Sequence, residues 1–226
     1  RTINELKRNR KELKNLDESC FPELKNEISK LKITKILRGV GFLIIDGKSF
    51  LDFSKNEIIK IYEMVCGMQG TLYVQNINSE KIVIIRDEGK SMMSGGRYHQ
   101  TKEGGSYHTD SPHWMNVPDL VGMLCIREAK KGGTSKFVSA YTIHNQLLKE
   151  QNDKLETLYK KFHFDKRGEF KTNESQTIFE PIFIFKDDKL YCRFIYDYII
   201  AGHEIQNRPL SKLQETALQS LEEISK

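Results

Sequence analysis

The spacing of apolar residues predicts helices near both ends of the chain. Residues 1–32 mix Lys and Glu with leucines at helical intervals, which predicts amphipathic helices broken near Pro22. We interpret this segment, residues 1–32, as an N-terminal helical extension in front of a main domain at residues 33–226. Ser54, followed three residues later by Glu57, forms a capping-box pattern that predicts the start of another helix. Further helices are predicted at residues 140–162 and 210–224.

Short apolar runs bounded by turn residues predict strands in the rest of the chain. Two of them, residues 177–185 and 189–195, flank Lys186-Asp187-Asp188 and are predicted to form a hairpin. Helices come first and strands mostly later, so the order does not show regular βαβ alternation. We therefore predict a mixed α/β (α+β) fold, with a sheet-on-sheet or barrel core flanked by helices. The other predicted strands cover residues 41–47, 81–86, 120–127 and 136–139.

The composition is that of a folded protein. Hydrophobic residues make up 38% of the 226 residues and aromatic residues 10%, which is enough to fill a core and excludes wholesale disorder. No apolar run approaches the roughly 18 residues needed to cross a bilayer, so no membrane partner is expected. The first residues are strongly charged, and they show no signal peptide.

The cysteines and the net charge limit the kinds of site, location and ligand that we expect. Four cysteines lie far apart without a C-x-x-C pair, which gives neither a structural zinc cluster nor a disulfide framework. We therefore expect a reducing, cytoplasmic location. The formal net charge of +5 is spread along the chain. It suits an anionic small ligand, and no nucleic-acid partner is predicted from it.

The segment around His108 and Asp110 carries the sharpest candidate chemistry. Residues i and i+2 of a β-strand point to the same face, so these two side chains can offer an imidazole nitrogen and a carboxylate oxygen to one metal ion, while Thr109 points away. With a second histidine from a distant strand, this is the facial triad of non-haem Fe(II) oxygenases, which leaves positions open for a co-substrate and dioxygen. The competing interpretation is a loop histidine that hydrogen-bonds a nearby aspartate.

The residues around this motif resemble a known family. His-Thr-Asp-Ser-Pro at residues 108–112, the apolar run at residues 118–127 and the paired glycines opening residues 132–139 are similar to the taurine dioxygenase and clavaminate-synthase-like family of 2-oxoglutarate-dependent oxygenases. The similarity covers most of the chain from about residue 33 onward. It implies a double-stranded β-helix (jelly-roll) core and Fe(II) held by two histidines and one carboxylate. It also implies 2-oxoglutarate and O2 as co-substrates.

The resemblance assigns roles to particular residues. His108 and Asp110 take two of the metal-ligand positions and are the candidate catalytic residues. Ser135, with Thr134 as the fallback, falls where the family has a hydroxyl that hydrogen-bonds a 2-oxoglutarate carboxylate. The alternative for Ser135 is an ordinary polar residue at a strand start. The family's distal histidine and its 2-oxoglutarate-binding arginine have no evident counterpart, so we expect the chain to lack the C-terminal strands that carry them.

Other polar residues receive weaker interpretations. His203 precedes the expected place of the distal histidine, and we interpret it as a surface or interface histidine rather than a metal ligand. Arg193 faces either the barrel interior or solvent, depending on the strand register, and a solvated charge is the favoured interpretation. His99, His113 and Trp114 lie near the motif, at the expected mouth of the barrel, and are weak candidates for substrate contact.

Together these patterns predict a dioxygenase that hydroxylates, or otherwise oxidises, an unactivated C–H bond of a small molecule, with release of succinate and carbon dioxide. The carboxylate of Asp110 favours hydroxylation over halogenation, because a halide site would need alanine or glycine at that position. The alternative is a double-stranded β-helix binding or scaffold protein without catalysis. A nucleic-acid module built on the charged N-terminus is a third interpretation. The primary substrate is not identified, and a homo-oligomer is compatible with the sequence.

Overall fold

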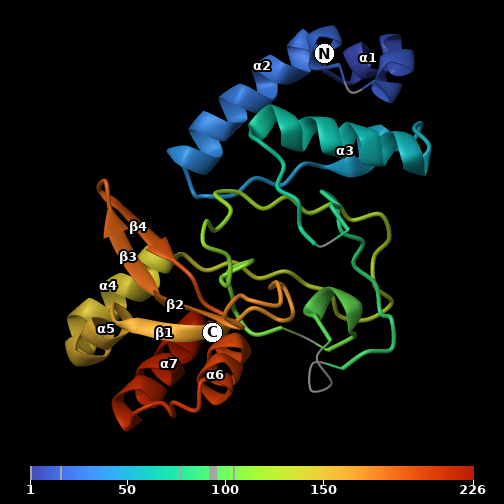
Figure 1. Ribbon diagram of the computed structural model, residues 1–226. Coiled ribbons are helices and arrows are strands. Elements are labelled where there is room, and N and C mark those ends of the chain that lie inside the picture. The colour runs from blue at the N-terminus through green and yellow to red at the C-terminus, as the bar shows by residue number, and fades with distance from the viewer. Residues whose placement is uncertain (1, 16, 77, 92–95, 104) are drawn as a thin grey trace. The chain divides into compact units, whose positions relative to one another are not determined.

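The computed structural model of the protein divides into two compact units (Figure 1). The first comprises Arg1–Val83 with Gly122–Glu128, and the second comprises Ile84–Val121 with Ala129–Lys226. The predicted division into a helical extension and a main domain stays a prediction. None of the helices in the described part of the chain is long and apolar enough to cross a membrane. The structure describes residues 2–15, 17–76, 78–91, 96–103 and 105–226.

The first unit is built from three α-helices: α1 (Thr2–Arg8), α2 (Pro22–Leu31) and α3 (Lys55–Gln69). Proline at the first position of α2 suits a helix start, because its φ is already fixed near the helical value. The predicted capping box is confirmed, since the Ser54 hydroxyl accepts the Glu57 N–H and the Glu57 carboxylate accepts the Ser54 N–H. The helices enclose Leu6, Leu13, Phe21, Leu24, Ile28, Phe53, Ile61 and Met64.

Single helical turns connect the longer elements. Three of them are 3-10 turns, and the fourth continues α2 as a π-helical turn. In chain order they are η1 (Arg10–Lys14), η2 (Glu18–Cys20), η3 (Lys32–Leu37) and η4 (Gly47–Phe50).

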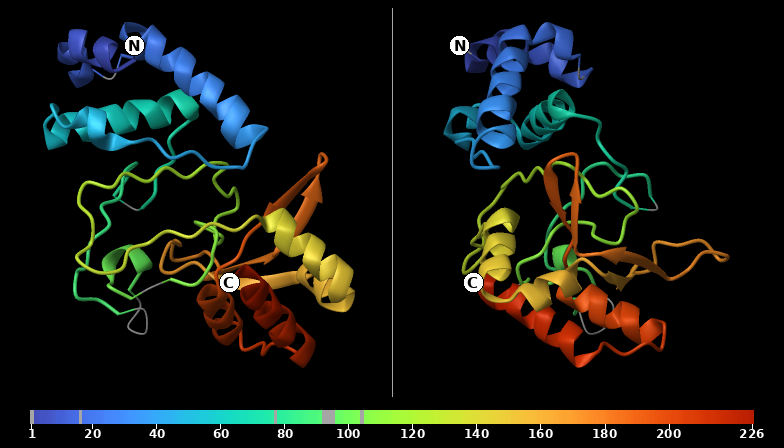
Figure 2. Two further views of the ribbon diagram at one scale, coloured as in Figure 1. Left: turned by 180° about the vertical axis from the view of Figure 1, so that it is seen from behind. Right: turned by 90° about the vertical axis from the view of Figure 1, so that its left-hand side faces the viewer.

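The second unit combines helices with two separate two-stranded antiparallel sheets (Figure 2). In one sheet Phe162 lies opposite Glu180, and in the other Lys186 lies opposite Lys189. The elements are η6 (Tyr98–Gln100), α4 (Ala140–Glu150), α5 (Asn152–Leu158), β1 (Lys161–Asp165), β2 (Thr177–Pro181), β3 (Phe183–Lys186), β4 (Lys189–Cys192), α6 (Tyr196–Ile205) and α7 (Lys212–Ser225). The predicted C-terminal helix is thereby confirmed as α7.

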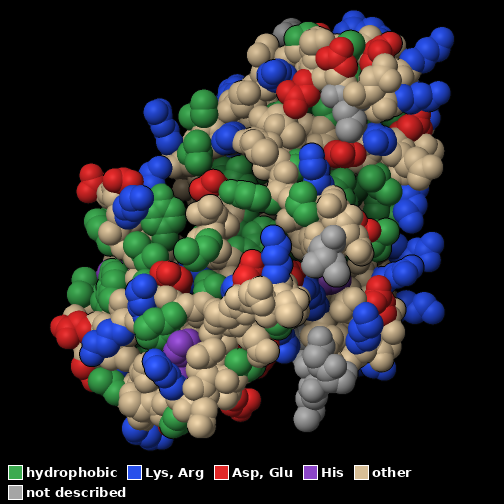
Figure 3. Space-filling view, in the orientation of Figure 1, with side chains coloured by type: hydrophobic (Ala, Val, Ile, Leu, Met, Phe, Trp, Pro, Cys, Tyr) green, Lys and Arg blue, Asp and Glu red, His purple; other side chains and the backbone are tan. Residues whose placement is uncertain are grey.

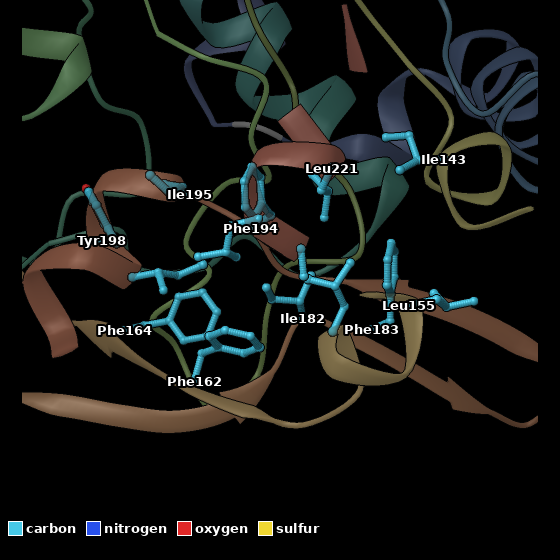
Figure 4. Close-up of a cluster of buried hydrophobic side chains, with 14 of the residues drawn as sticks. Ile143, Leu155, Phe162, Phe164, Ile182, Phe183, Phe194, Ile195, Tyr198 and Leu221 are labelled. Carbon is cyan, nitrogen blue, oxygen red and sulfur yellow. The ribbon is translucent and has the colours of Figure 1, made fainter. Parts of the chain in front are cut away.

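Aromatic and aliphatic side chains form the core of the second unit (Figure 4). Phe162, Phe164 and Phe183 are fully buried, together with Ile182 and Ile199. Burial of one such side chain contributes about 1.5–3 kcal/mol to folding before entropy is subtracted. The cluster joins strands β1 and β3 to helix α6, so it fixes the framework from which the site residues project.

The predicted hairpin is confirmed, but the strand before it is divided. Asp187 and Asp188 have φ values of 51° and 58°, the left-handed geometry of a two-residue hairpin turn between β3 and β4. The expected single strand at residues 177–185 is wrong, because the chain changes sheets at Ile182. The N–H of Ile182 donates to the Leu158 carbonyl at 3.1 Å, outside either sheet.

The helix predicted at residues 140–162 is too long. It comprises α4 and α5, and the chain then enters β1 at Lys161. The five residues of β1, KFHFD, alternate polar and apolar side chains, and four of them are buried, including the polar His163 and Asp165. The predicted helix therefore runs two residues too far, into a strand whose period of two begins at Lys161.

Four predicted strands are wrong for the residues that the structure describes. Ile44, Ile84 and Phe137, which lie in three of them, are exposed rather than packed in a sheet. A strand requires a neighbouring ladder for its N–H and C=O groups, and no described segment supplies one here. The fold is therefore mixed helix and sheet with small antiparallel sheets, and the double-stranded β-helix stays a prediction. The four segments are residues 41–47, 81–86, 120–127 and 136–139.

The charged side chains are dispersed over the visible surface. On the face drawn in Figure 3, Lys and Arg side chains alternate with Asp and Glu rather than forming one continuous basic area. This distribution matches the spread of charge along the sequence.

Candidate metal centre

His108 and Asp110 present their side chains to the same space. Nε2 of His108 lies 3.8 Å from Oδ1 of Asp110, and the two side chains are 30% and 54% exposed. The stretch that carries them is not assigned as a strand, yet the two side chains point to one side as the i, i+2 spacing predicts. The pair is accessible from solvent, which an incoming ion or ligand requires.

The ring of His108 is oriented by two neighbours. Its Nδ1 lies 2.7 Å from the carbonyl oxygen of Ser106, and because a carbonyl only accepts, Nδ1 carries the proton. Nε2 is then the nitrogen with a free lone pair, and it is the nitrogen that faces Asp110. The ring also stacks on Tyr98 with centroids 5.4 Å apart, and the Tyr98 hydroxyl donates to Asp197 at 2.7 Å. Burial, followed by the Asp197 carboxylate, raises the pKa of Tyr98.

Thr109, between the two candidate ligands, is tied to Phe194. Its N–H donates to the Phe194 carbonyl at 2.8 Å, and its hydroxyl accepts the Phe194 N–H at 2.9 Å. These two bonds hold the backbone between His108 and Asp110 against the β4–α6 connection.

Arg193 holds the segment that follows Asp110. Its guanidinium donates to the carbonyls of Pro112 at 2.9 Å, Trp114 at 3.0 Å and Met115 at 3.5 Å. Arg193 is 7% exposed. The expectation of a solvated charge is therefore wrong, because the side chain turns inward to satisfy backbone oxygens that have no strand partner.

Glu169 forms the hub of a second polar network. Its Oε2 accepts hydrogen bonds from Nε2 of His113 at 2.9 Å and Nε1 of Trp114 at 2.8 Å, and its Oε1 pairs with Arg97 at 2.5 Å. Burial opposes ionisation of Glu169, but these two donors and the charge of Arg97 outweigh it and lower the pKa of Glu169 to about 2. The carboxylate is therefore ionised at neutral pH, where it binds the side chains of His113 and Trp114.

A pocket opens beside this network. Its volume is about 450 Å³, and it is lined by His113, Trp114, Met115, Lys166, Glu169 and Ile178. The buried Nδ1 of His113 has no hydrogen-bond partner among the described residues. Two of the three weak substrate candidates, His113 and Trp114, are therefore brought together at one pocket, whereas His99 is not among its lining residues.

The donor set at His108 and Asp110 suits a divalent metal ion. Two donors that each lie about 2 Å from one ion can be at most about 4 Å apart, and the two atoms here meet that limit. The hydrogen bond from Nδ1 to a backbone carbonyl is the arrangement that fixes the tautomer of metal-binding histidines. No group of three or more His, Cys, Asp or Glu residues suited to a metal occurs within the described ranges.

His203 does not supply a third ligand. Its Nε2 accepts the N–H of His163 at 3.2 Å, and its Nδ1 donates to the Arg208 carbonyl at 2.7 Å. Both ring nitrogens are used and the side chain is buried. The interpretation of His203 as a surface or interface histidine is wrong, because α6 turns this residue onto β1 and buries it.

Ser135 and Thr134 lie on an exposed, extended stretch of the second unit. The two glycines before them, Gly132 and Gly133, have φ values of 78° and 76°, a left-handed turn that side chains disfavour. The role of the two hydroxyls toward 2-oxoglutarate stays a prediction. His99 is partly buried, and burial, followed by the nearby Arg97 charge, lowers its pKa.

Glu169 is a residue of this network that no sequence pattern predicted. It lies in the long connection between β1 and β2, where one carboxylate among charged residues carries no signal of burial. The only local hint is Gly168, whose φ of 81° turns the chain just before it.

Comparisons with known proteins agree with the motif. A model of the family described as "Taurine catabolism dioxygenase TauD, TfdA family" matches residues 10–212. FR-33289 synthase of Streptomyces rubellomurinus is 28% identical over 214 residues, which is 93% of this chain and 61% of that protein. Taurine hydroxylase-like protein SAT17 of Stachybotrys chartarum is 28% identical over 123 residues, which is 53% of this chain and 29% of that protein.

The family model and the two relatives match different lengths of sequence. The chain spans less than two thirds of the length of these curated relatives. The family match includes the His108-x-Asp110 motif, the Arg193 segment and the Glu169 network, and it extends over most of the chain. On this evidence the chain belongs to the TauD, TfdA family of dioxygenases.

Proposed function

We propose that this chain carries two of the metal ligands of an Fe(II)- and 2-oxoglutarate-dependent dioxygenase that oxidises a C–H bond of a small molecule. The observation that carries the proposal is the tautomer of His108. Its Nδ1 proton is held by the Ser106 carbonyl, so the free Nε2 lone pair faces the Asp110 carboxylate 3.8 Å away. Membership of a dioxygenase family supports the same reading. The jelly-roll core that this family implies is part of the proposal.

Each residue has a defined task in this scheme. His108 binds through Nε2 and Asp110 through a carboxylate oxygen, while Thr109 fixes the backbone between them by its bonds to Phe194. Bound Fe(II) supplies the redox chemistry, in which O2, 2-oxoglutarate and the substrate C–H bond yield an alcohol, succinate and carbon dioxide. Ser135, or Thr134, is proposed to donate a hydroxyl hydrogen bond to 2-oxoglutarate.

The pocket of His113 and Trp114 is the proposed place for substrate contact. It begins three residues after Asp110, and its apolar and polar lining is typical of small-molecule sites. The carboxylate at Asp110 occupies the position that a halide would need, so hydroxylation is the proposed outcome. The word "hydroxylase" in the name of one relative supports this choice.

Turnover of 2-oxoglutarate tests the proposal. The protein expressed from its complete coding sequence is incubated with Fe(II), 2-oxoglutarate and oxygen, and succinate is quantified. Iron-dependent succinate is expected, and it should fall at least 100-fold in His108→Ala and Asp110→Ala, a loss of about 2.7 kcal/mol or more. Asp119→Ala, which removes an exposed carboxylate shortly after the motif, is the matched control.

The same experiment separates the alternative function. A protein that binds 2-oxoglutarate but forms no succinate at any iron level is a binding or scaffold protein. That result would overturn the proposal of catalysis.

A further inference from the structure

We propose that Arg193 is a positioning residue for the metal ligand Asp110, acting through the backbone of the segment that follows it. The inference rests on the proposed function, because it assumes that Asp110 binds the metal. Among the described residues, Arg193 forms no hydrogen bond or ion pair with His108 or Asp110. It donates hydrogen bonds to three backbone carbonyls of the loop that follows Asp110, those of Pro112, Trp114 and Met115.

The burial of Arg193 shows that these contacts replace water. The residue is 7% exposed, and no carboxylate of the described residues lies within ion-pair distance of it. Burial lowers the pKa of Arg193, and the more distant Glu180 opposes the shift. A charge taken out of water without a carboxylate partner is costly unless its donors are satisfied. Here the planar fork of the guanidinium reaches several carbonyls at once from two nitrogens, which the single nitrogen of a lysine ammonium can reproduce only in part.

The backbone directly after Asp110 requires such support. Ser111 has a φ of 49°, the left-handed region that non-glycine residues rarely adopt. A conformation of this kind costs on the order of 1–3 kcal/mol and persists only where surrounding contacts impose it. The turn is closed by the Trp114 N–H, which donates to the Ser111 carbonyl at 3.0 Å.

The residue next to Arg193 holds the other side of Asp110. Phe194 exchanges two hydrogen bonds with Thr109, which immediately precedes Asp110. Adjacent residues of the β4–α6 connection therefore fix the chain before and after the ligand. Asp110, whose own side chain is 54% exposed, depends on this backbone for its direction.

A third set of contacts anchors the same loop independently. The side chains of His113 and Trp114 are bound by Glu169, whereas Arg193 binds the backbone. Loss of Arg193 should therefore loosen the Asp110 turn without releasing the whole loop. This separation makes the positioning role measurable apart from folding.

The test compares metal affinity with stability. Mn(II) is the probe, and its dissociation constant is measured for the complete protein by the electron paramagnetic resonance signal of the free ion. Arg193→Gln should weaken Mn(II) binding about 10- to 100-fold, the range typical of residues that orient a metal ligand. Arg193→Lys should recover part of the affinity. Ile199→Val, in the fully buried core of α6, lowers stability without touching the loop and should leave Mn(II) affinity unchanged.

A second pair of variants covers the case in which Arg193→Gln does not fold. Thr109→Val removes the acceptor for the Phe194 N–H at constant side-chain shape, and Thr109→Ser keeps it. Thr109→Val should weaken Mn(II) binding and Thr109→Ser should not. In the metal-free protein, amide hydrogen exchange at residues 109–115 should accelerate in Arg193→Gln and Thr109→Val but not in Ile199→Val.

The outcomes distinguish this inference from the proposed function. The metal site stands if the unmodified protein binds Mn(II) and His108→Ala abolishes this binding. The positioning role is wrong if, in addition, folded Arg193→Gln and Thr109→Val bind Mn(II) as tightly as the unmodified protein does. If the unmodified protein does not bind Mn(II), or if His108→Ala binds equally well, both are overturned.

Discussion

Gly202 of α6 lies directly against the backbone of His163 in β1. A Cβ at this glycine would lie 2.6 Å from the His163 carbonyl carbon and 2.8 Å from the backbone nitrogen of Asp165. Both neighbours are backbone atoms that a rotamer change cannot move. The contact sets how closely α6 approaches β1, and α6 follows directly from the segment that holds Thr109 and Pro112.

The first prediction concerns this contact. Gly202→Ala should destabilise the protein by about 3 kcal/mol, because overpacking against backbone forces α6 away from β1. Denaturant unfolding measures the loss. Gly168→Ala is a useful comparison, since it tests a positive φ of 81° without any close neighbour. An unchanged midpoint for Gly202→Ala would contradict the packing of α6 on β1.

A pair of buried histidines predicts acid sensitivity. Burial lowers the pKa of His163 and of His203 below the ordinary value of 6.5, and the charge of a protonated His203 would lower the pKa of His163 further. The backbone N–H of His163 donates to Nε2 of His203. The folded state therefore binds protons less readily than the unfolded state. Its stability is full above pH 6.5 and declines as the pH falls from 6.5 toward the lower folded values.

Unfolding by denaturant across this pH range measures the effect. His203→Gln retains an acceptor for the His163 N–H but cannot become charged, so its stability should depend less steeply on pH. A variant with the same pH slope as the unmodified protein would show that His203 does not contribute to the acid sensitivity.

Glu169 predicts a second change at lower pH. Its pKa is about 2 in the folded protein against an ordinary 4.5, so the stability that the ionised carboxylate provides is present above 4.5 and is lost as the pH falls toward 2. Glu169→Gln should cost about 2 kcal/mol at neutral pH, because hydrogen bonds to a charged group are replaced by weaker ones.

Fluorescence provides a local readout for this variant. Trp114 is the one tryptophan of the sequence, and its indole N–H donates to Glu169. Its emission should change in Glu169→Gln and stay constant in Glu174→Gln, which alters an exposed carboxylate of the same connection. Identical emission from the two variants would contradict the network.

Local signals in the sequence predicted several elements correctly. The Ser54 and Glu57 capping box, the turn at Asp187 and Asp188, and the spacing of α7 all depend on residues close together in the chain. The same holds for the i, i+2 relation of the His108 motif. Such features are set by short-range geometry, which one sequence records directly.

Features that depend on distant partners were not predictable in this way. The helix predicted at residues 140–162 overlaps the first two residues of β1, whose strand form depends on pairing with β2, and the apolar run at residues 41–47 has no described ladder partner. Arg193 and Glu169 look like ordinary surface charges in the sequence. Their roles follow from residues about 80 and 55 positions away, at the loop after Asp110.

The proposed binding of one metal ion by His108 and Asp110 can be observed directly. A ¹H–¹⁵N spectrum of the histidine side chains is recorded for the complete protein with and without Zn(II) as a diamagnetic substitute for Fe(II). We predict that Nε2 of His108 shifts on metal binding, that Nδ1 keeps its proton and donates it to the Ser106 carbonyl, and that Asp110→Ala weakens the change. Metal uptake that leaves both ring nitrogens of His108 unshifted would contradict the proposed binding.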